Sequence, residues 1–329
     1  MTGRWAGHSS VLGPHIEQYV RSKRAVGCKF QTEDRQLRLL DAYVRDCQIS
    51  DISGIDAKFL REFIASRNRQ NARSFNQLIG NVRRLFDWLV DQQVMCESPL
   101  KMRSRRESVR LLPVLFSVEN IKQILAVARS LPDNHRARLR GATYEMVFAI
   151  LAGLGIRIGE VANLRVGSID LDRELLEISN SKFGKDRLVP FGSKIAAMLL
   201  SYLKMRESGG FLCGPTDYLF SWSGRSPLST NSIRNTFREE ILPYVDVERA
   251  PGTFGPHVHG LRHSFAVRTL LRWYQDGDDP AARLHHLSTF LGHVRPSTTA
   301  VYLTMTWELL AAANGRFERY VFDAPAGDE

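Results

Sequence analysis

Apolar residues recur every three or four positions through the first part of the chain. One series is Leu37, Leu40, Val44 and Cys47, and a second is Phe75, Leu78, Val82, Leu85 and Leu89. This spacing gives each segment the apolar face of an amphipathic helix. Between the two series, Asp56 is placed to cap a helix that carries Phe59 and Phe63. Residues 1–98 are therefore expected to form a small helical domain.

The helical pattern lapses from residue 99 to residue 115, where the composition turns basic. Lys101, Arg103, Arg105, Arg106 and Arg110 stand against one acid, Glu107. Such a segment repels itself and stays extended. We interpret it as a linker, which is either only solvated or laid along a polyanion.

The pattern resumes at Ser117, a predicted N-cap, and a second apolar helix follows. Gly153 and Gly155 are expected to break that second helix, which places Arg157 on a helix-terminal bend. Residues 174–190 hold two β-prone runs around a polar turn and predict a hairpin. Helices are expected at 193–206 and at 230–242, the latter introduced by Thr230. The second domain, residues 116–329, is thus predicted to be mainly α with a small β-sheet.

One more amphipathic helix is expected beyond Pro280, with Gly292 as its C-cap. His293 should therefore emerge from a helix end. Ser297 is predicted to cap a short helix that carries Tyr302. From the local pattern alone, such a tyrosine is more simply a core residue.

The composition is that of a globular protein, with 43% hydrophobic and 24% charged residues in 329. Lysine and arginine outnumber aspartate and glutamate by 45 to 35, which gives a net charge of +10. This excess favours a polyanionic partner such as DNA, although charge that only aids solubility has the same signature. The four cysteines form no Cys-x-x-Cys pair and are expected to be reduced, mostly buried thiols of a cytoplasmic protein. The sequence predicts neither a signal peptide nor a membrane span.

Six residues suited to phosphate chemistry follow one another in the second domain. They are Arg157 in LGIRIGEV, Lys182 in SKFGKDRLVP, His259 and Arg262 in HGLRHSF, His293 in FLGH, and Tyr302 in TTAVYLT. His259 and Arg262 are three residues apart, so on a helix both side chains can reach one phosphate. His257 has Gly260 at the matching offset, which fixes the register.

Several of these residues have a plainer interpretation. Arg157 and Glu160 are spaced for an i,i+3 ion pair. Lys185 lies near the same turn as Lys182 and is the alternative lysine. His263 is interpreted as a buried histidine with satisfied hydrogen bonds. A metal site in this histidine-rich segment would lack a nearby acid.

Taken together, the six residues resemble the active-site set of the tyrosine recombinases, the lambda-integrase-type site-specific recombinases. The resemblance covers about the last two-thirds of the chain. It implies a helical core-binding domain at residues 1–98 that clamps DNA and an α+β catalytic domain at residues 116–329. It also implies that Tyr302 attacks a DNA phosphodiester and forms a 3′-phosphotyrosyl link, while Arg157 and Arg262 grip the phosphate.

The resemblance assigns the proton transfers as well. Lys182 would be the general acid toward the departing 5′-oxygen, His259 the general base toward the tyrosine, and His293 a hydrogen-bond donor to the phosphate. No cofactor or divalent metal is implied, because the covalent link stores the energy of the phosphodiester. The sequence contains no Walker A run, no dinucleotide fingerprint and no acid cluster for two metals.

The implied partners are double-stranded DNA recombination sites. The resemblance also implies a dimer on each site and a homotetramer in the synapse. The implied biological role is in a mobile genetic element. Basic residues outside the catalytic domain are candidate DNA contacts or a solvated face: Arg73, Arg83, Arg84, Lys101, Arg103, Arg105 and Arg106. A type IB topoisomerase shares the phosphotyrosyl chemistry and is one alternative. A non-catalytic DNA-binding factor on the same fold is another, and it would be marked by the loss of one of the six residues.

Overall fold

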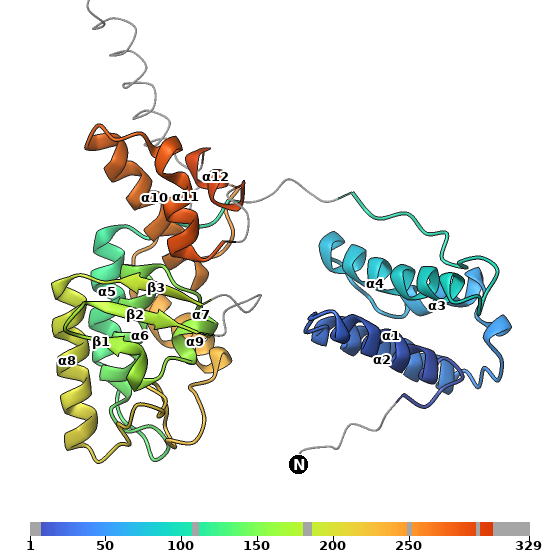
Figure 1. Ribbon diagram of the computed structural model, residues 1–329, viewed down its shortest axis with the longest axis horizontal. Coiled ribbons are helices and arrows are strands. Elements are labelled where there is room, and N and C mark those ends of the chain that lie inside the picture. The colour runs from blue at the N-terminus through green and yellow to red at the C-terminus, as the bar shows by residue number, and fades with distance from the viewer. Residues whose placement is uncertain (1–7, 107–111, 180–185, 249–251, 294–296, 305–329) are drawn as a thin grey trace, which may run out of the picture. The chain divides into compact units, whose positions relative to one another are not determined.

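The computed structural model describes residues 8–106, 112–179, 186–248, 252–293 and 297–304. The chain divides into two compact units, residues 1–110 and 111–329 (Figure 1). Each unit buries a hydrophobic core of its own. All six candidate catalytic residues belong to the second unit.

Four α-helices form the described part of the first unit. They are α1 (Gly13–Ala25), α2 (Gln31–Asp46), α3 (Ala57–Ala65) and α4 (Ala72–Asp91), with a 3-10 turn at Ile52–Gly54. The apolar faces of α2 and α4 meet in the core, where Leu37 and Leu78 are fully buried. The carboxylate of Asp56 accepts a hydrogen bond from the Phe59 amide at 2.7 Å. The predicted cap of α3 is therefore confirmed.

The basic segment after α4 is attached to this first unit. Leu100 is buried in its core, and the backbone carbonyl of Met102 accepts a hydrogen bond from Arg83. Asn76 pairs with both the amide and the carbonyl of Arg105, at 2.7 and 2.8 Å. The guanidinium of Arg105 also lies 3.6 Å from the centre of the Phe75 ring. Residues 99–106 are thus held along α4.

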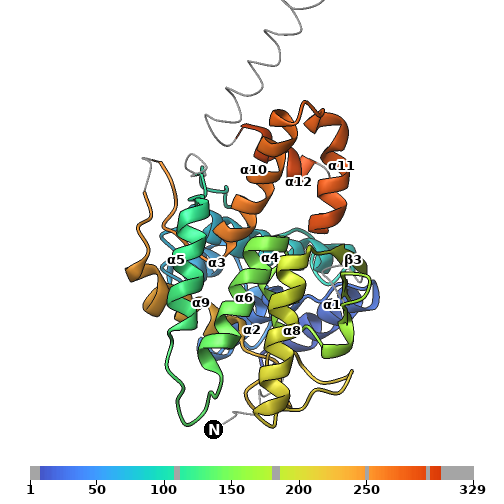
Figure 2. The same ribbon diagram turned by 90° about the vertical axis from the view of Figure 1, so that its left-hand side faces the viewer.

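The second unit is mainly helical. Its long helices are α5 (Val118–Arg129), α6 (Arg140–Leu154), α8 (Ser193–Ser208), α10 (His259–Gln275) and α11 (Pro280–Leu291). Its short helices are α7 (Ile158–Ala162), α9 (Thr230–Thr236) and α12 (Ser297–Ala300). Helix α6 is central and buried on nearly all sides, because it packs against α5, α8 and α10 (Figure 2). The chain therefore leaves α6 beside α10, where Arg157 follows.

Three short antiparallel strands, β1 (Ile169–Asp170), β2 (Leu175–Ile178) and β3 (Arg187–Pro190), form a sheet in that order. The hairpin predicted at 174–190 is confirmed by the pairing of Leu176 with Val189, although its turn at 180–185 lies outside the described residues. In β3 the side chains alternate between two faces. Val189 is buried, whereas Leu188 is 60% exposed. Arg187 therefore lies on the inner face, where its side chain is only 9% exposed.

Two predictions about helix ends were right only in part. Gly153 lies inside α6, and the helix ends only at Gly155, whose φ is +58°. Packing on every side of α6 outweighs the weak helix preference of glycine. The helix expected at 230–242 begins at Thr230, as predicted, with Ser229 as its N-cap, but it passes from α9 into a π-helical turn at Phe237–Ile241.

The cysteines also differ from the prediction. Cys28, Cys47 and Cys96 are exposed and Cys213 is half-buried, and all four are free. Cys47 was expected on the apolar face of α2, but it is the C-cap of that helix and faces solvent. Within the described ranges, no helix combines the length and the apolar character needed to cross a membrane.

Candidate active site

Arg157 is held at the start of α7 by the helix itself and by α11. Its amide and its Nη1 both donate to the Glu160 carboxylate, at 2.9 and 2.7 Å, so the expected i,i+3 ion pair is present. Its Nη2 donates to the Gly292 carbonyl at the C-terminal end of α11. Burial alone would raise the pKa of Glu160. Hydrogen bonds from Arg187 and Arg157 outweigh burial and lower that pKa, so the carboxylate stays charged.

Arg262 lies in the first turn of α10 and is 2% exposed. Its Nη1 donates to the Gly155 carbonyl at 2.7 Å, and its Nη2 donates to the Leu291 carbonyl at 2.8 Å. Burial, and then the charge of Arg157, lower the pKa of Arg262 to about 10, so it remains cationic at neutral pH. Two candidate arginines thus hold neighbouring carbonyls at the end of α11.

Tyr302 lies on a 3-10 turn (Val301–Thr304) that directly follows α12, and it is 4% exposed. Its hydroxyl is 3.0 Å from Nδ1 of His263. Burial raises the pKa of Tyr302, and the charge of Arg262 partly offsets this rise. Burial, followed by the neighbouring His259, lowers the pKa of His263 to about 3. At neutral pH the ring is uncharged, and in the tautomer that carries its proton on Nε2, Nδ1 accepts a hydrogen bond from the tyrosine hydroxyl.

His259 lies one helical turn before His263 on α10. The two rings are nearly perpendicular, with centroids 4.6 Å apart. Burial and the Arg262 charge lower the pKa of His259 to about 4. His259, which was expected to be the general base, therefore lies beside the histidine that contacts Tyr302.

His293 follows Gly292, the C-cap of α11 with a φ of +68°, as predicted. Its Nδ1 is 2.7 Å from Thr299 Oγ1, and its ring lies nearly parallel to that of Tyr302 with centroids 6.4 Å apart. Burial and the Arg262 charge lower the pKa of His293 to about 4. The ring is thus neutral at pH 7 and sits between α11 and α12.

The structure therefore gathers five of the six predicted residues around the C-terminal end of α11, where the first turn of α10, the start of α7 and the turn after α12 come together. Lys182 and its alternative Lys185 lie outside the described residues. Strand β3, which follows their segment, reaches the same place, because Arg187 donates from Nε to the Phe290 carbonyl at 2.9 Å.

Two residues of this cluster, Arg187 and His263, were not predicted to be functional. Arg187 had a signal in the sequence, since it shares the inner face of its strand with Val189 and is a charge where an apolar residue is expected. His263 had none beyond its spacing from His259. Its contact with Tyr302 depends on how α12 packs on α10.

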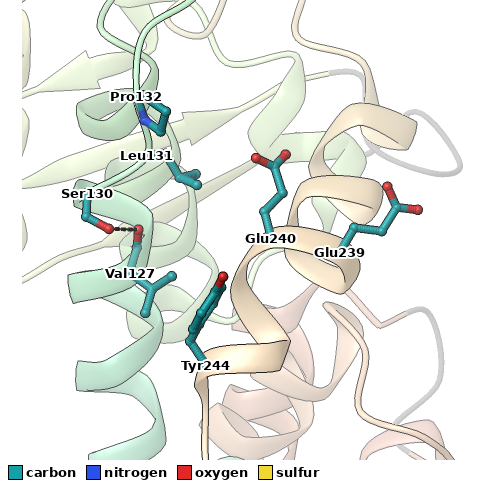
Figure 3. Close-up of a pocket in the computed structure, with 7 residues that line it drawn as sticks. All are labelled: Val127, Ser130, Leu131, Pro132, Glu239, Glu240 and Tyr244. Carbon is teal, nitrogen blue, oxygen red and sulfur yellow. Dashed lines mark hydrogen bonds between the residues drawn. The ribbon is translucent and has the colours of Figure 1, made fainter.

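Other features of the second unit lie apart from this cluster. A hollow of about 400 Å³ separates Leu131 and Pro132 from Glu240 and Tyr244, and no predicted catalytic residue lines it (Figure 3). Across the described part of the chain, no three histidine, cysteine or acidic side chains are grouped to hold a metal ion.

In the first unit, Arg73 and Arg84 are exposed on α4, while Arg83 is half-buried.

A family model and several known proteins are similar in sequence to this chain. The model of the phage integrase family matches residues 115–308. A putative integrase/recombinase, y4rB of Sinorhizobium fredii, is 31% identical over 311 residues, which cover 94% of this chain and 98% of that protein. Tyrosine recombinase XerC of Proteus mirabilis is 27% identical over 296 residues, or 87% of each chain.

Solved structures share the fold. The XerH site-specific recombinase, in a post-cleavage complex with palindromic difH substrate, aligns with a TM-score of 0.62 and 20% identity over 92% of this chain and 84% of its own. A lambda integrase dimer bound to a COC′ core site aligns with a TM-score of 0.61 and 16% identity, over 88% and 76% of the two chains. The family model and the relative from Sinorhizobium fredii together show that this chain belongs to the phage integrase family of tyrosine recombinases, enzymes that cleave and rejoin DNA through a tyrosine intermediate.

Proposed function

We propose that this enzyme recombines specific DNA sites of a mobile genetic element, with Tyr302 as the nucleophile. The observation that carries the proposal is the Tyr302 hydroxyl, which is buried, bonded to a neutral histidine and close to Arg262. The mobile-element role is supported by relatives named as integrases and by the fold shared with the Tn1549 transposon integrase, at a TM-score of 0.62.

The first step forms a bond from Tyr302 Oη to phosphorus and breaks the bond from phosphorus to the 5′-oxygen. Forming phenolate at neutral pH costs about 4 kcal/mol for an ordinary tyrosine, and burial of Tyr302 adds to that cost. Arg157 and Arg262 offset it. A guanidinium has five N–H donors, so each arginine can keep its carbonyl contact while it donates to non-bridging oxygens, where charge builds in the transition state. His293 adds a further hydrogen bond to the phosphate.

The tyrosine proton passes to the histidine pair on α10. His263 is the immediate acceptor, because its Nδ1 is the ring atom 3.0 Å from the hydroxyl, and His259 lies behind it. Bound phosphate supplies negative charge that raises the pKa of both rings toward the range in which a base is effective. Lys182 protonates the departing 5′-oxygen. In the second step the 5′-hydroxyl of a partner strand attacks the phosphotyrosyl link, and the proton returns to Tyr302.

The proposed partner is duplex DNA, bound as a dimer on each site and as a tetramer in the synapse. The exposed arginines of α4 and the basic residues 101–106 are held together on the first unit and supply phosphate contacts. We place this reaction in the cytoplasm, where the DNA substrate lies.

Covalent trapping tests the proposal. The protein is incubated with nicked suicide duplexes tiled from DNA that flanks its own gene, and adducts are separated on a denaturing gel. An adduct is expected for the wild type and for Tyr274→Phe, a matched variant in the same hydrophobic cluster, but not for Tyr302→Phe. Adduct formation by Tyr302→Phe would refute the assignment of the nucleophile. Relaxation of supercoiled DNA without strand exchange between sites would instead indicate topoisomerase activity.

A further inference from the structure

Three consecutive carbonyls end helix α11, and each accepts a hydrogen bond from a different arginine. Phe290 accepts from Arg187 at 2.9 Å, Leu291 accepts from Arg262 at 2.8 Å, and Gly292 accepts from Arg157. The last carbonyls of a helix have no partner within it and carry partial negative charge. The end of α11 is therefore a natural place to hold cations.

Glu160 joins two of these arginines. Both carboxylate oxygens accept from Arg187, at 3.0 Å from Nη1 and 2.8 Å from Nη2, in a two-pronged contact. The same carboxylate accepts from Nη1 and from the amide of Arg157. The side chains of Glu160 and Arg187 are 7% and 9% exposed, whereas that of Arg157 is 25% exposed. The exposed member of the group is the one assigned to the phosphate, and the buried pair stands behind it.

We infer that Arg187 is a positioning residue of the active site, which acts through Glu160 and the end of α11 on Arg157. This inference rests on the proposed function. The nitrogens of Arg187 are committed to Glu160 and to the Phe290 carbonyl. Arg187 is thus a fixed brace, whereas Arg157 is the cation presented to DNA.

Arg187 also joins two parts of the site that are remote in sequence. It is the first residue of β3 and directly follows the segment with Lys182, while its Nε contact lies three residues before His293. The start of β3 is therefore anchored to the end of the helix that His293 follows. Lysine cannot replace this arginine, because an ammonium group cannot make the two-pronged contact and the Nε contact together.

Single-turnover cleavage of the suicide duplex tests the inference. Arg187→Met and Arg187→Lys are each expected to cleave about 100-fold more slowly, the loss typical of a misplaced catalytic group. DNA affinity should change less than about threefold, since Arg187 touches no phosphate. Arg206→Met is the matched control. Arg206 is also buried and holds the carbonyls of Leu212 and Tyr218, so its loss should lower stability and leave the cleavage rate of folded protein unchanged.

Two further measurements distinguish a positioning role from a general loss of folded structure. Without Arg187, Glu160 loses a hydrogen bond and a charge that lower its pKa, so that pKa rises and the acid limb of the pH–rate profile should move to higher pH. The double variant Arg187→Met/Glu160→Gln should cleave no more slowly than the slower of the two single variants, because both substitutions remove the same contacts to Arg157. The inference would be overturned if Arg187→Met cleaved within about threefold of the wild-type rate and its acid limb did not move. It would also be overturned if the rate losses of the two single variants multiplied in the double variant.

Thermal melts test the contact of Arg187 with Glu160 in the absence of DNA. Arg187→Met should be clearly less stable than wild type at neutral pH, and the difference in Tm should narrow as acid protonates Glu160. A difference that is independent of pH would contradict the role of Glu160. If the wild type forms no adduct but the melts behave as expected, the proposed function fails, while the structural support that Arg187 gives to Glu160 is confirmed.

Discussion

Gly292→Ala is the substitution that most directly probes the end of α11. Gly292 has a φ of +68°, and an added Cβ would lie 2.8 Å from Arg187 Nη1 and 2.9 Å from its Cζ. Gly277, with a φ of +81° and open space around the same position, is the matched control. Left-handed backbone costs an alanine about 1–2 kcal/mol. In a domain of this size that cost lowers Tm by about 2–8 °C, and both variants should show it.

Only Gly292→Ala should also lose activity. The guanidinium of Arg187 must shift away from the added Cβ, and that movement weakens its paired contacts with Glu160. The loosened site should cleave a suicide duplex on the order of 100-fold more slowly. Single-turnover rates, corrected for the folded fraction, provide the measurement. Equal cleavage rates for Gly292→Ala and Gly277→Ala would refute the reasoning, whatever their Tm values.

Three other outcomes are expected. Tyr302→Phe should abolish the covalent adduct and leave DNA affinity within about twofold of wild type, as a gel-shift titration would show, because the hydroxyl forms the bond but does not neutralise phosphate. Burial lowers the pKa of His259 and His293 to about 4 and that of His263 to about 3, from an ordinary 6.5. Protons therefore favour the unfolded chain, so the free energy of unfolding should be greatest above about pH 6.5 and fall as the pH drops toward 4; denaturant titrations that give a flat profile would contradict this. DNA affinity should fall steeply with salt, and Arg73→Ala with Arg84→Ala should reduce the slope of log K against log salt by about 0.9 for each lost phosphate contact. An unchanged slope would remove those two arginines from the interface.

Much of the fold follows from local pattern. The faces of α2 and α4, the caps at Asp56 and Gly292, and the hairpin at 174–190 each depend on residues close together in sequence. The errors arise where tertiary packing decides. Gly153 stays helical because α6 is surrounded, and Cys47 is exposed because α2 ends there.

The candidate site divides along the same line. Arg157, Arg262 and Tyr302 could be singled out because their order and their flanking residues are distinctive. The partner of Tyr302 could not be predicted, since which histidine of α10 faces the hydroxyl depends on how a short turn packs on that helix. The three carbonyls of α11 carry no side-chain signal, because any residue supplies a backbone carbonyl. Arg187 was within reach of sequence reasoning through the alternation of its strand.

The anchoring of residues 99–106 to the first unit determines where the chain can be divided for work on separate fragments. A polypeptide that stops at residue 98 loses Leu100, whose buried side chain contributes about 1.5–3 kcal/mol, and also the paired contacts of Asn76 with Arg105. It also discards four of the seven basic residues considered for DNA. A cut after Arg106 keeps the core and all seven of these basic residues together, so affinities measured on that fragment include the contribution of each of them.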